Sequence, residues 1–125
     1  MKIKSKYHFR FEDLILYQKA ILFGELVNDI LIKFPKNEQF KLTSQFGRAA
    51  DSITLNIAEG YSGTDANFNR YLLISLGSIN ESVACTTKAK LRNYITNDEF
   101  EDLRKKLSEL SKMNSKLRKR LITNS

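Results

Sequence analysis

The side chains that could perform catalysis or hold a metal are few in this sequence. His8 is the only histidine and Cys85 the only cysteine among 125 residues. The histidine precedes the first helical pattern and the cysteine lies on a line of small residues, so they are not placed as a base and its nucleophile. They also fall short of a zinc site, and the glycines form no phosphate-binding loop. We therefore predict a protein that is not an enzyme and has no cofactor, no metal and no small-molecule substrate.

Positive charge is concentrated near the two ends of the sequence. Residues 1–10 contribute +4 and residues 112–125 contribute +5 without a single acid, so the net charge of +7 leaves 7 − 9 = −2 for residues 11–111. Such clusters either contact a polyanion or only solubilise the chain and complement a helix dipole. The candidate nucleic-acid-binding residues are Lys2, Lys4, Lys6, Arg10, Lys112, Lys116, Arg118, Lys119 and Arg120.

The elements that would position these side chains are helices. Apolar residues recur at steps of three and four, and turn clusters at 35–38, 60–64 and 93–97 separate the periodic segments. We predict an all-α fold, an antiparallel up-down-up-down four-helix bundle that forms a single domain over residues 1–125. Its helices are expected at about 12–33, 42–60, 65–94 and 97–121, after a basic segment at 1–10, and the third should be longest.

Local signals fix several of these boundaries. Thr96 and Glu99 have the spacing of a capping box, and Thr64 is a candidate N-cap for the third helix. Pro35 disfavours helical backbone at the residue before it, so the first helix should stop near Lys33. The second and third helices are rich in small residues, which predicts that their backbones approach closely.

The first helix is apolar around most of its circumference. Ile15 lies outside the heptad seam, and Leu22 and Ile32 fall within the arc that would otherwise be polar. A second copy of the chain is the simplest cover for these residues, so we predict a homo-oligomer with Ile15, Leu22 and Ile32 in its interface. No apolar run approaches the roughly 20 residues that cross a bilayer, and no signal-peptide pattern is present. We expect a cytoplasmic protein without a membrane partner.

The topology also predicts where the basic clusters lie. In an up-down-up-down bundle the first helix starts and the fourth ends at the same end. The two clusters should therefore converge into one positive end.

A motif in the second predicted helix is more specific than bundle packing. Arg48-Ala49-Ala50 is followed by Ser52-Ile53 and by Asn56-Ile57-Ala58-Glu59-Gly60. With Phe34-Pro35, Phe68-x-Arg70-Tyr71-Leu72 and Gly77-Ser78-Ile79-x-Glu81, this string closely resembles the four-helix bundle proteins encoded within intervening sequences of bacterial 23S ribosomal RNA genes. The chain departs from their usual pattern at Lys41, Gly47 and Thr54, where those proteins carry glycine, arginine and proline.

The resemblance implies a ring-shaped homopentamer. A relative serves as accessory protein to a retroelement reverse transcriptase, so the resemblance also implies binding to structured RNA or to a nucleic-acid-handling partner. The alternative is a structural or protein-interaction module with no nucleic-acid role. Antiparallel pairing about the 60–64 turn further predicts a polar network, because it sets Arg48 near Glu81 and Glu59 near Arg70. Ion pairing within the protein and direct phosphate contact by the arginines both stay open.

Overall fold

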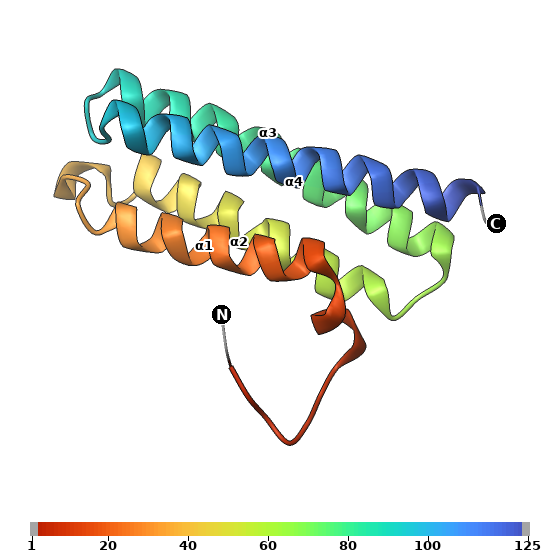
Figure 1. Ribbon diagram of the computed structural model, residues 1–125. Helices are drawn as coiled ribbons and strands as arrows, with labels where there is room; N and C mark the ends of the chain where they lie inside the picture. Colours follow the sequence, from red (N-terminus) through yellow and green to blue (C-terminus); the bar gives the residue numbers. More distant parts are fainter. Residues whose placement is uncertain (1–2, 124–125) are drawn as a thin grey trace.

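Four long helices and two short 3-10 turns make up the part of the chain that the computed structural model describes, residues 3–123 (Figure 1). Successive long helices run antiparallel, and none of the described residues forms a strand. The predicted all-α four-helix bundle is confirmed. In chain order the elements are η1 (Arg10–Asp13), α1 (Ile15–Leu31), η2 (Lys36–Glu38), α2 (Leu42–Tyr61), α3 (Asp65–Leu91) and α4 (Asn97–Thr123).

The first helix starts later than the sequence predicted. α1 begins at Ile15 rather than near Glu12, because Leu14 has extended backbone (φ −67°, ψ 123°) and Arg10–Asp13 forms the separate turn η1. The Glu12 carboxylate closes that turn by accepting the backbone N–H of Phe9 at 2.9 Å. A capped 3-10 turn therefore forms where the sequence predicted the first turn of the α-helix.

The same helix also ends before the predicted Lys33. The N–H groups of Lys33 and Phe34 each donate to the carbonyl three residues earlier, at 3.1 and 3.0 Å. This tightening of the last turn leads into Pro35, which excludes a further helical residue before it. α1 consequently ends at Leu31.

The third helix stops at Leu91, short of the predicted Tyr94. Asn93 adopts the left-handed conformation (φ 62°), and the N–H of Tyr94 then reaches the carbonyl of Ala89 at 2.9 Å. The N–H of Asn93 reaches Lys90 at 3.0 Å, which completes a Schellman motif. α3 and α4 are both 27 residues long, so the prediction that the third helix is longest is wrong.

Both predicted N-caps are confirmed. Thr96 Oγ1 accepts the N–H of Glu99 at 3.1 Å, and the Glu99 carboxylate accepts the N–H of Thr96 at 2.9 Å. Thr64 Oγ1 accepts the N–H of Asn67 at 3.1 Å. The Thr96–Glu99 bonds are reciprocal, whereas Thr64 makes one cap bond. All of them satisfy backbone donors near the helix N-termini, and they fix the starts of α4 and α3.

The core lies between all four long helices and follows the heptad seams. Its largest fully buried members come from every helix, so each helix contributes one apolar stripe to a single cluster. They include Phe23 and Val27 of α1, Phe46, Ile53 and Ile57 of α2, Leu72 and Ile79 of α3, and Leu103, Leu107 and Leu110 of α4.

The most extensive helix contact in the bundle joins α2 to α3. A Cβ atom added to Gly60 would stand 2.4 Å from the Cβ of Tyr71, so only glycine fits there without movement. The hydroxyl of Ser75 donates to the carbonyl of Ile53 across the interface at 2.9 Å, and Ser75 is fully buried. Small side chains thus let the two backbones meet, as the sequence predicted.

We expect Gly60→Ala to destabilise the fold by about 1–3 kcal/mol, because the added methyl group overpacks the α2–α3 contact. Gly77→Ala is the matched control, since a Cβ at Gly77 meets nothing within 4 Å. That variant should gain about 0.5–1 kcal/mol from helix propensity. Urea denaturation followed by circular dichroism measures both, and equal effects would contradict the close approach.

Candidate interaction surfaces

A stripe of lysines follows the outer face of α4. Lys105, Lys112, Lys116 and Lys119 recur at steps of seven, four and three residues, which places them on one side of the helix, and all four are exposed. Steps of four residues separate neighbouring charges by about 6 Å along the axis. Arg120 is exposed beside them, and residues 112–123 contain no acid. The C-terminal half of α4 is therefore a continuous cationic ridge.

Arg118 has a different role from its cationic neighbours. Its Nε donates to Asn114 Oδ1 at 2.9 Å and its Nη2 to Ser115 Oγ at 3.2 Å. Asn114 is fully buried and donates in turn to the carbonyl of Leu72 at 2.9 Å. This chain of hydrogen bonds connects α4 to α3 and holds the guanidinium against its own helix. Arg118 is thus half-buried and structural in the single chain.

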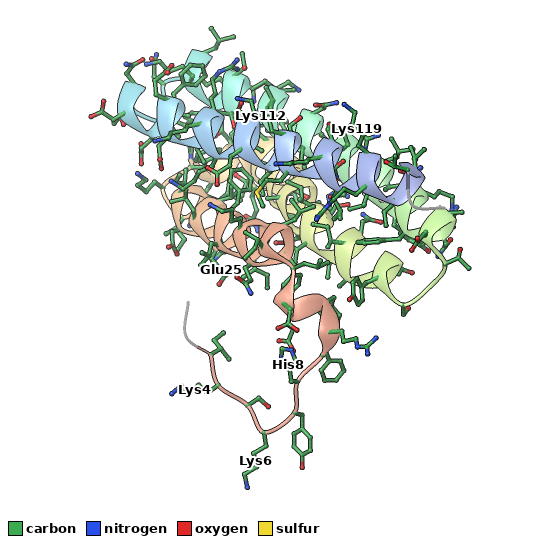
Figure 2. All side chains as sticks on the ribbon, turned by 45° about the vertical axis from the view of Figure 1, so that its right-hand side comes forward. Lys4, Lys6, His8, Glu25, Lys112 and Lys119 are labelled. Carbon is green, nitrogen blue, oxygen red and sulfur yellow. The ribbon has the colours of Figure 1, made fainter. Side chains whose placement is uncertain are left out.

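The structure does not bring the two basic clusters together. Figures 1 and 2 show the segment before η1 turning away from the bundle on the side of α1, whereas Lys112 and Lys119 lie on α4 at the opposite side. The capped turn η1 redirects the chain, so it does not continue along the axis of α1 toward the end of α4. Lys4, Lys6 and Arg10 are exposed there, and Lys2 lies outside the described residues. The predicted convergence is wrong for the single chain.

The predicted polar network is not formed as ion pairs. The register is correct, because Ser78 Oγ donates to Ser52 Oγ at 2.9 Å and thereby places Arg48 near the level of Glu81. Arg48 nevertheless turns to the carbonyl of Ser44, at 3.4 Å, and all of these charged side chains are exposed. Water competes well for such charges, and fixing two long side chains costs entropy.

The second predicted pair meets around an aromatic ring instead. Glu59 accepts a hydrogen bond from the hydroxyl of Tyr71 at 3.4 Å, and the Arg70 guanidinium stands 5.1 Å from the centre of the same ring. The motif residue Asn56 donates to both the carbonyl and the hydroxyl of Ser52, at 2.8 and 2.9 Å. The motif therefore supplies a neutral hydrogen-bonded seam between α2 and α3, a role that the sequence did not reveal.

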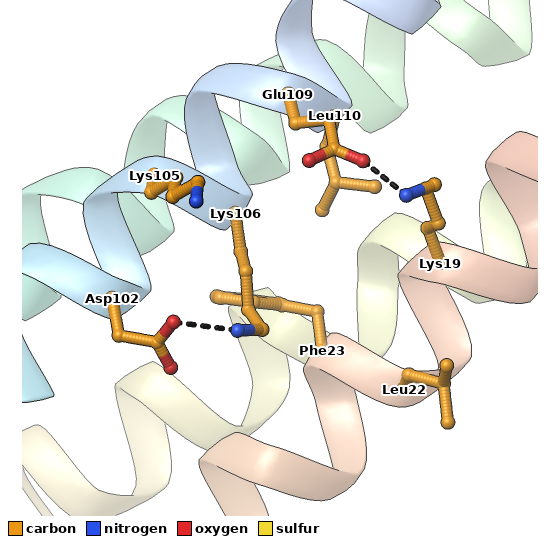
Figure 3. A pocket seen from close by; sticks show the side chains of 8 residues that line it. All are labelled: Lys19, Leu22, Phe23, Asp102, Lys105, Lys106, Glu109 and Leu110. Carbon is orange, nitrogen blue, oxygen red and sulfur yellow. Dashed lines mark hydrogen bonds and ion pairs between the residues drawn. The ribbon is translucent and has the colours of Figure 1, made fainter.

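The three apolar residues proposed for an interface are all exposed. Ile15 is 55%, Leu22 47% and Ile32 78% accessible in the single chain. Leu22 also borders a groove of about 280 Å³ between α1 and α4, which Figure 3 shows from close by. Ion pairs flank this groove, Lys19 with Glu109 across the helices and Lys106 with Asp102 at 2.6 Å along α4. Among the described residues, these two ion pairs engage the charged side chains that line it apart from Lys105, whose charge acts on Glu109.

A buried polar cluster lies at the end of the bundle that carries the α1–α2 and α3–α4 connections. The sequence did not predict it. Glu38 of η2 is 6% accessible, and its Oε2 accepts hydrogen bonds from Tyr94 Oη at 2.7 Å and from Arg92 Nη1 at 2.8 Å. The Tyr94 hydrogen bond, and then the positive charge of Arg92, hold the pKa of Glu38 below its usual value against the opposing effect of burial. The cluster ties the α1–α2 connection to the α3–α4 connection.

No feature of the described residues resembles a catalytic or metal centre. Burial raises the pKa of the Cys85 thiol to about 11, which leaves it protonated and unreactive at neutral pH. Within residues 3–123 no three His, Cys, Asp or Glu side chains are grouped as metal ligands. None of the helices described is long and apolar enough to span a membrane.

The antiparallel four-helix bundle places the chain among all-α proteins, and the bundle and its α2–α3 seam can be compared with known members of that class. The family model of the 23S rRNA-intervening sequence proteins matches residues 12–116, and the chain belongs to this family. A solved structure from Bacteroides thetaiotaomicron, described as a protein of unknown function from the S23 ribosomal protein family, superposes with a TM-score of 0.76. It is 27% identical, and the match covers 84% of this chain and 99% of that one. A comparison with curated proteins found no match.

The matched region has a consequence for the basic residues. Lys112 and Lys116 lie inside residues 12–116, whereas Lys4, Lys6, Arg10, Lys119 and Arg120 lie outside it. Family membership therefore covers the bundle and its seam, and the terminal charges must be interpreted from this chain alone.

We expect Glu38→Gln to lower the free energy of unfolding at neutral pH, because the amide keeps the shape but loses the charge that Arg92 and Tyr94 bind. A carboxylate whose folded-state pKa is depressed stabilises the fold above its unfolded pKa, near 4.5, and this stabilisation is lost as the pH falls through the folded-state value. The difference between parent and variant should therefore shrink in acid. Urea titrations at neutral and acidic pH measure it, with the exposed Glu101→Gln as control; identical behaviour of the two variants would contradict the assignment.

Proposed function

We propose that the protein is a non-catalytic, oligomeric adaptor that binds structured RNA or a nucleic-acid-handling partner in the cytoplasm. The observation that carries the proposal is the cationic ridge of α4, in which Lys112, Lys116, Lys119 and Arg120 are exposed and have no acid beside them in residues 112–123. A rigid helix with cations at steps of three and four residues offers several phosphate contacts at once.

Ion pairs that neutralise acidic side chains of α4 support the proposal that the cationic ridge binds a polyanion. Three of the five acids of α4 pair with other cations, Glu99 with Lys33, Asp102 with Lys106 and Glu109 with Lys19 of α1, and the other two, Asp98 and Glu101, lie near the opposite end of the helix. The ridge is thus not cancelled by its own helix, and its field extends into solvent. The names of the family and of the solved relative refer to ribosomal RNA and to a ribosomal protein family, which makes ribosomal RNA the first polyanion to test.

Self-association is part of the proposal. The exposed Ile15, Leu22 and Ile32 on and beside α1 form the apolar surface that a second copy would cover. Five copies follow only from the family resemblance. A ring would repeat the α4 ridge around its axis, so weak phosphate contacts would add through multivalency.

A protein-interaction module is the competing function. Phe40, Leu91 and Ile32 are exposed at or near the end of the bundle that carries the Glu38 cluster, and such side chains suit a protein partner better than a polyanion. This reading requires no contribution from the lysines of α4. RNA binding and its dependence on salt therefore separate the two functions.

The ridge variant Lys112→Gln, Lys116→Gln, Lys119→Gln should weaken RNA binding at low salt. Each lost phosphate contact lowers the slope of log affinity against log salt by about one unit, so the slope should fall by about two to three. Filter binding or fluorescence anisotropy with a 23S rRNA fragment, over a series of salt concentrations, measures both quantities. Arg118 is kept, because its substitution would also disturb the Asn114 hydrogen bonds.

The matched control removes the same charge elsewhere. Lys36, Lys41 and Lys88 are exposed on other parts of the bundle, and each is replaced by glutamine. This variant should retain the affinity and slope of the parent. Equal losses in both variants would mean that only net charge matters, and a parent without measurable binding at low salt would favour the protein-interaction module.

A further inference from the structure

The segment before η1 is exposed along its whole length. We call residues 3–9 the arm. Its apolar side chains Ile3, Tyr7 and Phe9 are 82%, 78% and 59% accessible. They occupy odd positions, whereas Lys4, Lys6 and His8 occupy even ones. The arm bends at Lys6 and Tyr7, where the Tyr7 N–H donates to Ser5 Oγ at 3.1 Å, so it is not a straight strand with two faces. It offers apolar and cationic side chains within a few residues of one another.

The base of the arm is fixed, which sets the direction in which it leaves the bundle. His8 Nε2 stands 3.0 Å from Asp13 Oδ1, and the N–H of Phe9 is held by Glu12. The ring of Phe9 also packs near Phe11, with their centres 6.1 Å apart. The arm is therefore anchored at residues 8 and 9 and stands off from α1 beyond them (Figure 2).

A groove of complementary character lies between α1 and α2. Its volume is about 240 Å³. Ile21, Gly24, Thr54 and Leu55 supply its apolar and small surface, and Glu25 and Asp51 supply two exposed carboxylates. Among the described residues, no lysine or arginine lines it.

The charges of this groove are open to a partner. The ion pairs of residues 3–123 leave out both Glu25 and Asp51. The guanidinium of Arg48, one turn before Asp51, is instead bound to the Ser44 carbonyl. The exposed side chain of Leu55, 63% accessible, stands beside the carboxylates and would be covered by an apolar occupant.

We propose that the arm of one copy of this chain docks into the α1–α2 groove of a second copy. Lys4 and Lys6 pair with Glu25 and Asp51, and the apolar side chains of the arm cover Leu55 and Ile21. The docking rests on the self-association proposed above and names the surfaces through which the copies meet. Each contact joins an arm to a groove, so the interface is heterologous and can close a ring.

The partner copy, rather than the same chain, is the occupant that the geometry favours. The arm does not enter the groove of its own chain, although Glu25 lies on the side of α1 that faces it (Figure 2). The anchored turn at residues 8–13 directs the chain away from the bundle, and the arm then bends back toward α1 (Figure 1). Ile3 nevertheless stays 82% accessible, so the arm's own chain does not cover it. Docking in a neighbouring copy buries the same apolar side chains without breaking that turn.

Charge reversal in two variants tests the docking. The arm variant carries Lys4→Glu and Lys6→Glu, and the groove variant carries Glu25→Lys and Asp51→Lys. Each alone should weaken self-association by about tenfold or more, because like charges then oppose each other. A mixture of the two should restore association between unlike copies, since the arm of each variant meets a groove of opposite charge in the other. A ring of five would keep one like-charge contact. Sedimentation velocity measures the assembly, and circular dichroism confirms that each variant is folded.

The control variant, Lys36→Glu with Lys88→Glu, changes the net charge as the arm variant does and should assemble like the parent. An oligomeric parent whose arm and groove variants assemble normally overturns the docking alone. A mixture that stays dissociated, while one chain carrying all four substitutions assembles, indicates an arm bound within its own chain and also overturns the docking between copies.

If the arm variant loses RNA affinity but not assembly, the arm is a polyanion contact, and the docking is overturned. A monomeric parent removes both the docking and the proposed self-association, whereas RNA binding by the α4 ridge is measured separately.

Discussion

The close approach of α2 to α3 is the contact on which the rest of the fold depends. At Gly60 the two helices leave no room for a Cβ atom, and the Ser75 hydroxyl bonds directly to a carbonyl of the facing helix. Ser52, Asn56 and Ser78 continue this contact to the surface as a hydrogen-bonded seam. α1 and α4 complete the core against this pair, and their own mutual contact relies in part on exposed ion pairs such as Lys19 with Glu109. Exposed ion pairs are weak, so we expect α2 and α3 to form the most stable part of the bundle.

Buried polar side chains hold the helices and connections together, whereas the exposed lysines of α4 remain available for binding. Asn114 uses both ends of its amide to join α4 to the Leu72 carbonyl and to hold Arg118. That arrangement fixes the rotation of α4 and leaves Lys112, Lys116 and Lys119 facing solvent. At the opposite end Glu38, Arg92 and Tyr94 join the two connections. Binding surfaces are thus carried on a scaffold whose buried polar groups set its geometry.

The sequence predicted those parts of the fold that depend on local or periodic signals. The heptad seams, the Thr64 and Thr96 caps and the small-residue contact of α2 with α3 all follow from spacing within one or two helices. The left-handed Asn93 and the 3-10 turn before α1 depend on competition between backbone conformations, which periodicity does not resolve. The Glu38 cluster joins positions 54 residues apart in the sequence. For exposed charges such as Arg48, water competes with every protein partner, so spacing alone does not determine the contact that forms. Register could be predicted, whereas side-chain pairing could not.

We infer that the α2–α3 pair is the most stable unit of the bundle and holds the other helices in place. Native-state hydrogen exchange of the full chain tests it most directly, because each amide reports the free energy of the opening that exposes it. We expect the slowest exchange at the facing residues 53–57 of α2 and 72–79 of α3, with the ends of α1 and α4 opening at lower free energy. Slower exchange in α1 or α4 than in this pair would contradict it.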